Sequence, residues 1–374
     1  MLKKEDLKKL IEKGMSNADI AEQENVNIRT VEKWKQKYGF SNGNGIKFED
    51  RVGIEKVKLL ADKEKSVFKK LLKEKSRTEN IIDAFRGSIP KLPKASPKLA
   101  ELPKHTSKNK EELILLLGDL HIGQKVDLAV VVGLGEYNFD IFKERLSRLK
   151  EGILKILSYE VPRRSIENLK IFCLGDMIEG LNVFSSQAYE TEMHVIDQVI
   201  NGVSEIADFI LSLSGIFKNI DVFAVPGNHG VPGGKHGGSP FDLNFDRLFY
   251  HFVSERLSNN KNIHFNIAKE WFQLVEILGW EFLAIHGDQI KGGGSFPWAG
   301  WDKVDSRYMR ILNRPFHYLL SGHYHTCVSQ ATANGERFCN GSFVGANALT
   351  RAISNASVPS QMLLGISESF GITF

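Results

Sequence analysis

Five short apolar runs, each followed within two residues by glycine and accompanied there by metal-binding residue types, constrain the fold of this chain most. The runs span residues 113–117, 169–174, 220–225, 282–285 and 316–320. Amphipathic helical stretches at about 139–158, 193–213 and 241–257 separate several of them. Alternation of this kind, with continuously apolar strands, predicts an α/β sheet that is buried on both faces.

The segments after the runs carry the polar chemistry. They read GDLH at 118–121, GD at 175–176, PGNH at 226–229, HGD at 286–288 and SGHYH at 321–325. Because ligands bind beyond the carboxyl ends of the strands in open α/β sheets, these residues should meet at one edge. Five of the 11 histidines lie in these segments, so the joint pattern favours a binding site over unrelated turns.

Mixed carboxylate, imidazole and amide side chains are typical ligands of borderline divalent ions such as Mn²⁺, Fe²⁺ or Zn²⁺. The set is too large for one tetrahedral zinc ion. Two ions about 3.5–4 Å apart that share one carboxylate account for its size. Such a pair binds a phosphate oxygen and lowers the pKa of water, while a neighbouring histidine can protonate the leaving oxygen. We expect manganese first, with iron and zinc as alternatives.

Over roughly residues 112–345, five segments resemble, in the same order, the five signature blocks of the calcineurin-like metallophosphoesterases. They are GDLHIG, GDMIEG, PGNHG, IHGD and SGHYH. The resemblance implies an α/β fold for 111–374, a four-layer sandwich of two mixed sheets flanked by helices. It also implies a role for each polar residue. The first metal would bind Asp119, His121 and His325, the second Asn228, His286 and His323, with Asp176 as the bridge and His229 as the general acid.

Two departures from the family pattern bear on the substrate and on His229. Gly180 and Leu181 follow Glu179, where the protein phosphatases of the family carry a phosphate-binding arginine, which argues against a phosphoprotein substrate. Gly230 stands where most branches have an acidic residue after the catalytic histidine. Such a carboxylate would orient the imidazole, and Glu179 or Asp288 are the candidates to replace it.

Two glycine-rich segments, 230–239 and 287–301, predict a surface around the site that contacts a polymer. Flexible glycines with cationic and aromatic side chains suit a phosphate chain and stacked bases. The candidates are Lys235, His236, Lys291, Phe296, Trp298 and Trp301. The alternative interpretation is a loop rim with two core tryptophans.

Residues 1–42 predict a small helical module. Helical spacing around residues 7–11 is followed by a second helix that Ser16 or Asn17 can cap, a break at 25–27 and a third helix to Gly39. The spacing resembles the helix-turn-helix of resolvase-like and terminase-like DNA-binding units. That resemblance makes 27–37 the recognition helix and directs Arg29, Thr30, Lys33 and Lys37 toward DNA. The alternative is a basic three-helix unit that binds protein.

Charge divides the chain at residue 110. Residues 1–110 hold 27 Lys and Arg against 16 Asp and Glu, a net of +11, and residues 111–374 hold 22 against 29, a net of −7, so the sum is +4. Within the basic part, 43–110 predicts a helical arm at 46–86 and then a Pro/Lys-rich linker. A basic segment attracts phosphates whatever their sequence, although a solvated helix face and a linker would look the same.

These features predict a dinuclear-metal phosphodiesterase, a nuclease that hydrolyses DNA and is recruited by its helix-turn-helix. It would be similar to DNA-repair exonucleases of the SbcD kind and to phosphoesterases of phage and prophage genomes. Alternatives are a phosphomonoesterase, a cyclic-nucleotide or protein phosphatase, or a DNA-binding regulator with a nucleotide-sensing or inactive body. Nucleases of the family are often dimers, so a homodimer is one expected state.

The sequence also predicts where the protein works. Its three scattered cysteines indicate reduced thiols rather than a disulfide framework. The first residues lack the apolar segment of a signal peptide, and no apolar run is long enough to cross a bilayer. We therefore expect a cytoplasmic protein with no membrane partner.

Overall fold

The computed structural model describes residues 2–40, 79–80, 89–94, 110–129, 131–160, 164–181, 183, 187–232, 243–292, 296–347 and 357–374. The chain divides into two compact units, Met1–Lys73 and Glu74–Phe374. Almost all of the predicted helical arm at 46–86 and most of the linker at 87–110 lie outside the described residues. Among the described residues, no helix combines the length and apolar character needed to span a membrane.

Three helices form the described part of the first unit: α1 (Lys4–Glu12), α2 (Asn17–Gln23) and α3 (Ile28–Tyr38). Ser16 caps α2 through a capping box with Asp19. Asn27 caps α3 by accepting a hydrogen bond from the backbone N of Arg29 at 2.9 Å, and α3 ends at Gly39 in the left-handed conformation. The helices enclose a small apolar core made of Leu7, Ile20, Ala21, Val31 and Trp34.

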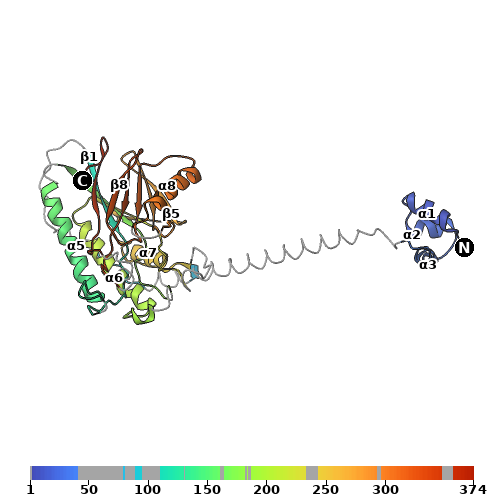
Figure 1. Cartoon of the computed structure of the whole chain (residues 1–374), viewed down its shortest axis with the longest axis horizontal. Helices are drawn as coiled ribbons and strands as arrows, with labels where there is room; N and C mark the ends of the chain where they lie inside the picture. Colours follow the sequence, from blue (N-terminus) through green and yellow to red (C-terminus); the bar gives the residue numbers. More distant parts are fainter. Residues whose placement is uncertain are drawn as a thin grey trace. The chain divides into compact units, whose positions relative to one another are not determined.

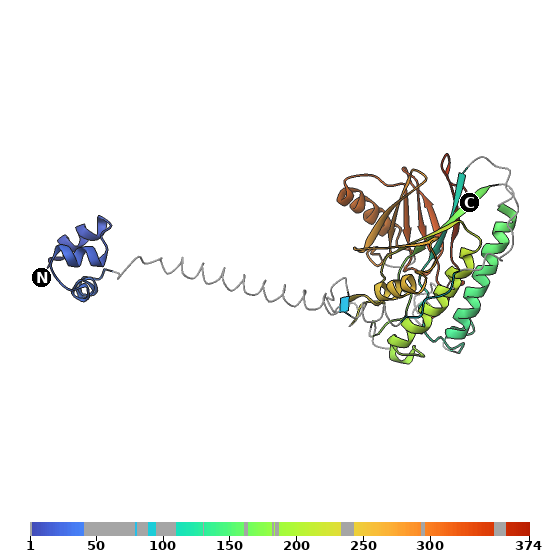
Figure 2. The same ribbon diagram turned by 180° about the vertical axis from the view of Figure 1, so that it is seen from behind.

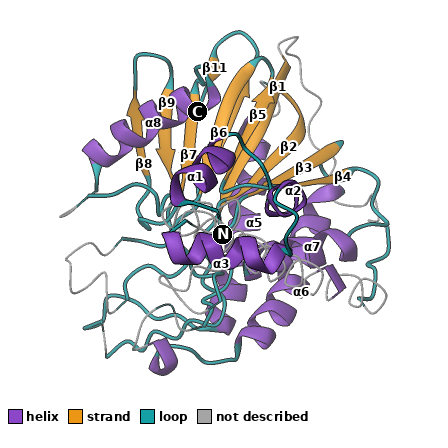
Figure 3. Ribbon diagram, turned by 90° about the vertical axis from the view of Figure 1, so that its right-hand side faces the viewer, coloured by secondary structure: helices purple, strands orange, loops and turns teal. Residues whose placement is uncertain are grey.

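Two mixed β-sheets build the second unit (Figure 3). The first sheet has the order β11-β10-β1-β2-β3-β4, with parallel pairing from β1 to β4 and antiparallel pairing of β10 to β1 and to β11. Its strands are β1 (Lys110–Leu117), β2 (Ser165–Cys173), β3 (Asn219–Ala224), β4 (Ile263–Ile267), β10 (Leu363–Ser367) and β11 (Gly371–Ile372).

The second sheet has the order β5-β6-β7-β9-β8. Its middle strands β6, β7 and β9 pair in parallel, and β5 and β8 pair antiparallel at the two edges. The strands are β5 (Phe272–Ile277), β6 (Trp280–Ile285), β7 (Tyr318–Ser321), β8 (Val328–Ala331) and β9 (Glu336–Cys339). All five predicted runs are therefore strands, three in the first sheet and two in the second.

Helices cover the outer face of each sheet, as Figures 1 and 2 show from opposite sides. On one side lie α5 (Phe139–Glu160), α6 (Val195–Ser214) and α7 (Phe245–Arg256), and on the other lies α8 (Trp298–Leu312). Successive residues of β1 point to opposite faces, so Leu115 packs in the core under α5–α7 and Leu116 packs between the sheets. Trp301 and Val304 of α8 pack on the second sheet. The four-layer sandwich is confirmed.

Three differences from the sequence-based expectations concern elements with weak local signals. Helix α8 begins at Trp298, inside a segment whose glycines predicted a loop to 301, and β4 and β5 were not predicted. Part of the predicted linker is docked: Ile89 and Leu92 pack against the core, and the backbone N of Leu92 donates to the carbonyl of Arg256 at 2.9 Å. An ion pair between Lys91 and Glu255 at 3.3 Å and hydrogen bonds from the side chains of Asn259 and Asn260 to the carbonyls of Leu92 and Pro93 also hold this stretch.

Candidate metal centre

The structure brings together all eight polar residues that the strand-end pattern singled out. Three groups of side chains each place their ligand atoms within 4.8 Å of one another. The groups are Asp119, His121 and His325; His121, Asp176 and His229; and Asp176, His286 and His323. Asn228 completes the set, since its Oδ1 lies 3.0 Å from Nε2 of His286. The residues follow β1, β2, β3, β6 and β7, so the edges of both sheets contribute.

The first metal-ligand group contains one carboxylate and two imidazoles. Nε2 of His121 lies 3.0 Å from Nε2 of His325, and the latter nitrogen lies 3.5 Å from Oδ1 of Asp119. That oxygen is buried and has no hydrogen-bond partner among the described residues. A buried carboxylate oxygen without a donor is costly unless a cation satisfies it, so this group fits a metal ion.

The second metal-ligand group, formed by Asp176, His286, His323 and Asn228, also fits a metal ion. Nδ1 of His286 donates to the carbonyl of Leu174 at 2.7 Å, which leaves Nε2 of the neutral ring as an acceptor. This Nε2 faces two other acceptors, Oδ2 of Asp176 at 3.1 Å and Oδ1 of Asn228 at 3.0 Å. Three acceptors need a cation between them. Burial would lower the pKa of His286, but the charge of Asp176 raises it to about 10, so without metal a proton takes that place.

Asp176 lies between the first metal-ligand group, which contains His121, and the second, which contains His286. Its Oδ2 lies 3.1 Å from Nε2 of His286 and 3.9 Å from Nε2 of His121. Burial opposes ionisation of Asp176, yet the surrounding histidines hold its pKa well below the usual value, so the group is a carboxylate. A single carboxylate within reach of both histidines fits a bridge between two divalent ions.

Unusual backbone conformations present these ligands at the sheet edges. Among the described residues, nine non-glycine positions have positive φ, and five of them are predicted ligands: Asp119, His121, Asp176, His323 and His325. Each such conformation costs of order 1–3 kcal/mol, and residues that adopt it cluster at functional sites. The motif glycines make room, because a Cβ at Gly227 would lie 2.1 Å from Oδ1 of Asp176 and one at Gly322 would lie 2.4 Å from Oδ2 of Asp119.

Glu179 takes the orienting role that the sequence left open between Glu179 and Asp288. Its carboxylate lies 2.8 Å from Nδ1 of His121 and 3.5 Å from Nδ1 of His229, and its backbone carbonyl accepts from the latter nitrogen at 2.8 Å. The acidic side chain is fully buried. Burial would raise its pKa, but His229 and His121 lower it to about 2.

His229 stands beside Asp176 and His121 with its ring fixed. Its backbone N donates to Oδ1 of Asp176 at 2.8 Å, and its ring lies edge-on to that of His121, with the centroids 4.5 Å apart. Burial would lower the pKa of His229, but the charges of Asp176 and Glu179 raise it to about 9 in the metal-free protein. A side chain on the next residue would require a shift, since a Cβ at Gly230 would lie 2.4 Å from Oδ1 of Asn244.

One supporting residue was not predicted from the sequence. Asp246, in the first turn of α7, is fully buried and accepts hydrogen bonds from the backbone N atoms of Asp176, Met177 and Gly227. Burial and the neighbouring Asp176 raise its pKa to about 6. Its only sequence signal is an acidic residue after Asn244, which is equally typical of an ordinary helix start.

The predicted substrate loops are described in part. Lys235 and His236 lie outside the described residues. Lys291 is exposed and its Nζ donates to the carbonyl of Asp288 at 2.5 Å. Trp298 is 44% exposed, so its ring is accessible, but Trp301 is completely buried. For Trp301 the alternative interpretation, a core tryptophan, is therefore confirmed, because its ring fills the core between α8 and the second sheet.

An aromatic cluster extends from the metal centre to Trp298. The ring of His323 lies 5.1 Å from that of Tyr324, which lies 5.4 Å from Phe296, and Phe296 lies 4.8 Å from Trp298. All these rings are at the distances of favourable aromatic pairs. The cluster places the exposed tryptophan on the side of the centre where His323 lies.

In the first unit, the predicted DNA-facing residues lie on α3. Arg29, Lys33 and Lys37 are exposed and Thr30 is half-buried. The three cationic residues are four positions apart, so they share one face of the helix. Val31 and Trp34 on the other side pack in the core.

The chain belongs to the calcineurin-like phosphoesterase family, whose sequence profile matches residues 113–327. A curated relative, the SPbeta prophage-derived uncharacterized protein YonJ of Bacillus subtilis, is 23% identical over 334 residues, covering 86% of this chain and 77% of the relative. The protein is thus a metal-dependent phosphoesterase, and its ligand groups fit the two-metal chemistry of the family.

Solved structures of similar fold include Vps29 with zinc from Entamoeba histolytica, 16% identical, covering 67% of this chain and 84% of that one, with a TM-score of 0.31. A novel archaeal phosphodiesterase is 14% identical, covering 62% of this chain and 84% of that one, with a TM-score of 0.28.

Proposed function

We propose that the protein is a two-metal phosphodiesterase that hydrolyses DNA, with Mn²⁺ as its metal. The observation that carries the proposal is the position of the Asp176 carboxylate between two ligand groups, next to a histidine that Glu179 orients. When bound, two divalent ions would supply charge for a phosphate oxygen and lower the pKa of water.

The side chains of the chain supply the rest of the chemistry. Asp119, His121 and His325 would hold one ion, and Asn228, His286 and His323 the other, with Asp176 shared. His229 donates its Nδ1 proton to the carbonyl of Glu179, so its Nε2 is the atom that can protonate a leaving oxygen. The raised pKa keeps the ring protonated at neutral pH in the metal-free protein.

Three observations favour a nucleic acid as the substrate. The exposed cationic row Arg29, Lys33 and Lys37 on α3 fits phosphates along a DNA groove, and the first 110 residues carry a net charge of +11, 27 minus 16. The exposed ring of Trp298 suits base stacking beside the metal centre, with Lys291 nearby in sequence. The sequence-based proposal for substrate contacts also includes Lys235 and His236, which lie outside the described residues. The prophage origin of the relative agrees with a nucleic-acid enzyme.

The test is hydrolysis by the purified, Mn²⁺-loaded chain. Single- and double-stranded DNA, bis(p-nitrophenyl) phosphate and p-nitrophenyl phosphate would be offered in parallel. We expect hydrolysis of DNA and of the diester reporter, and its loss in His229→Asn but not in the matched His264→Asn, whose side chain is exposed on β4. Robust monoester hydrolysis with no diester hydrolysis would sink the proposal in favour of a phosphomonoesterase.

A further inference from the structure

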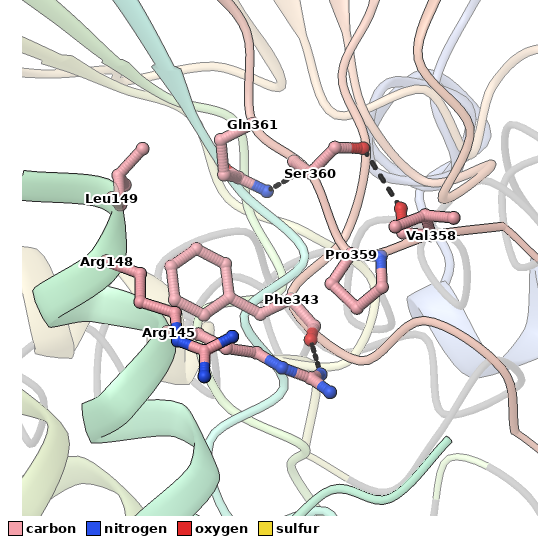
Figure 4. A pocket seen from close by; sticks show the side chains of 8 residues that line it. All are labelled: Arg145, Arg148, Leu149, Phe343, Val358, Pro359, Ser360 and Gln361. Carbon is pink, nitrogen blue, oxygen red and sulfur yellow. Dashed lines mark hydrogen bonds between the residues drawn. The ribbon is translucent and has the colours of Figure 1, made fainter. Parts of the chain in front are cut away.

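A cavity of about 410 Å³ lies beside α5, outside the metal-ligand set (Figure 4). Two segments of the C-terminal part of the chain, around Phe343 and around 358–361, form its other walls. The volume lies within the range of roughly 300–1,000 Å³ that is typical of small-molecule sites. We call it the Arg145 cavity, after the cation on its α5 wall; its lining includes Arg145, Arg148, Leu149, Phe343, Pro359 and Gln361.

The Arg145 cavity carries positive charge that the described residues do not neutralise. The guanidinium of Arg145 donates to backbone carbonyls, those of Phe343, of Val344 at 3.1 Å and of Glu136 at 3.0 Å, and lies over the ring of Tyr137. Among the described residues, no carboxylate forms an ion pair with it. Arg148 pairs only with Glu144 there, at 2.5 Å, and remains 73% exposed. Arg145, Arg148 and Glu144 together carry a net charge of +1, which favours binding of an anion.

The other walls are apolar or already hydrogen-bonded. Phe343 is only 3% exposed, so the accessible apolar surface comes from Leu149, which is partly buried, and from Pro359. The side-chain amide of Gln361 is engaged on both ends: Oε1 accepts from the backbone N of Gly118 at 3.0 Å, and Nε2 donates to the carbonyls of Gly118, Gly341 and Ser360. The cavity therefore suits a molecule with one anionic group and one apolar, flat body.

The walls of the cavity are bonded to the backbone that presents the first metal-ligand group. The backbone N of Phe343 and Oγ of Ser342 donate to the carbonyl of Asp119, at 3.1 and 2.9 Å. Gln361 holds the preceding residue, Gly118, through both of its amide atoms. A molecule in the cavity would thus lie one layer of backbone away from the turn that carries Asp119.

We propose that the Arg145 cavity binds a nucleoside monophosphate unit, with the phosphate at Arg145 and Arg148 and the base against Leu149 and Pro359. Guanidinium groups match phosphate oxygens in geometry and charge, and a base offers the flat apolar face that these walls accept. The unit is either a free nucleotide or a nucleotide of a DNA strand. The site is independent of the metal ions, so it can be tested without them.

The test is calorimetric titration of the metal-free full-length chain with deoxyadenosine monophosphate. We expect saturable binding, with inorganic phosphate and deoxyadenosine each bound at least about tenfold more weakly, since each meets only half of the site. Arg148→Gln should weaken binding of the nucleotide about three- to tenfold, because one charge-assisted hydrogen bond is removed. Lys150→Gln, a matched change of charge on α5 outside the cavity lining, should leave it unchanged.

Two further measurements complete the test. Arg145→Gln should weaken binding at least as much, but Arg145 also bonds the backbone at 343–344, so the Arg148 variant provides the result if the Arg145 variant does not fold. A short oligodeoxynucleotide that displaces the nucleotide would identify a strand unit as the natural occupant, and failure to displace it would identify a free nucleotide. No saturable binding, or equal binding by Arg148→Gln and the unchanged chain, would overturn the proposal.

Discussion

The backbone carbonyl oxygen of Glu179 accepts a hydrogen bond from Nδ1 of His229 at 2.8 Å, and the Glu179 carboxylate lies 3.5 Å from the same nitrogen. The same carboxylate lies 2.8 Å from Nδ1 of His121, a proposed metal ligand. One residue therefore fixes the ring orientation of both the proposed general acid and a ligand of the first metal-ligand group. Glu179 thus makes the contacts to the His229 ring that the family pattern assigns to an acidic residue at position 230.

Removing the charge of Glu179 should impair turnover. Glu179→Gln keeps the backbone carbonyl but weakens the hold on both rings, so we expect metal affinity or kcat to fall about 10- to 100-fold. KM for the diester reporter should change little. Steady-state kinetics at saturating Mn²⁺ separate the two effects, and Glu167→Gln, whose carboxylate is half-exposed and pairs with Lys218, is the control. Unchanged kinetics in Glu179→Gln would show that it does not position His229.

The stability of the metal-free protein should depend on pH through the same pair. The pKa of Glu179 is lowered to about 2 from 4.5, so its contribution is complete above pH 4.5 and is lost as the pH falls through 2. The pKa of His229 is raised to about 9 from 6.5, so its contribution is complete below pH 6.5 and is lost as the pH rises through 9. Together they favour the folded state most between pH 4.5 and 6.5.

Urea unfolding in EDTA across this range measures the effect. Glu179→Gln should flatten the acid side of the profile and His229→Asn the alkaline side, relative to the unchanged chain. Parallel profiles for all three proteins would contradict the assigned pair.

Gly230 should tolerate no side chain. A Cβ there would lie 2.4 Å from Oδ1 of Asn244, which caps α7, and 2.9 Å from the backbone N of Asp246. Gly230→Ala should therefore destabilise the protein by about 1–3 kcal/mol. Gly135→Ala, where a Cβ has no atom within 4 Å, is the control. Thermal unfolding compares the two, and equal melting temperatures would show that the turn at 230 relaxes without cost.

The cationic face of α3 should serve DNA binding and not hydrolysis. Alanine at Arg29, Lys33 and Lys37 together should weaken binding to duplex DNA, and the slope of log K against log salt should fall by about one for each phosphate that a side chain no longer neutralises. Hydrolysis of the small diester reporter should not change. A control variant, Lys8→Ala on α1, removes an exposed cation that pairs with Glu12. If the triple variant binds DNA as before, α3 does not contact it.

The sequence predicted that the candidate ligands lie together because each of them follows an apolar run, and the sheets bring the carboxyl ends of such strands together. The support around the ligands was harder to predict. Asp246 looks like an ordinary helix-start residue, and its contacts to Asp176 and Gly227 arise only in three dimensions. The glycines at 292–294 concealed the start of α8, and nothing local distinguishes the buried Trp301 from the exposed Trp298 three residues earlier.

The metal content of the chain tests the central claim most directly. After equilibration with Mn²⁺ and removal of excess metal, elemental analysis should find two ions per chain, and fewer than two in Asp176→Asn, because that carboxylate reaches both ligand groups. The variant should also lose diester hydrolysis by about a thousandfold, since metal stabilisation of the transition state is worth several kcal/mol. One ion or none in the unchanged chain, or two ions and full hydrolysis in Asp176→Asn, would contradict the account.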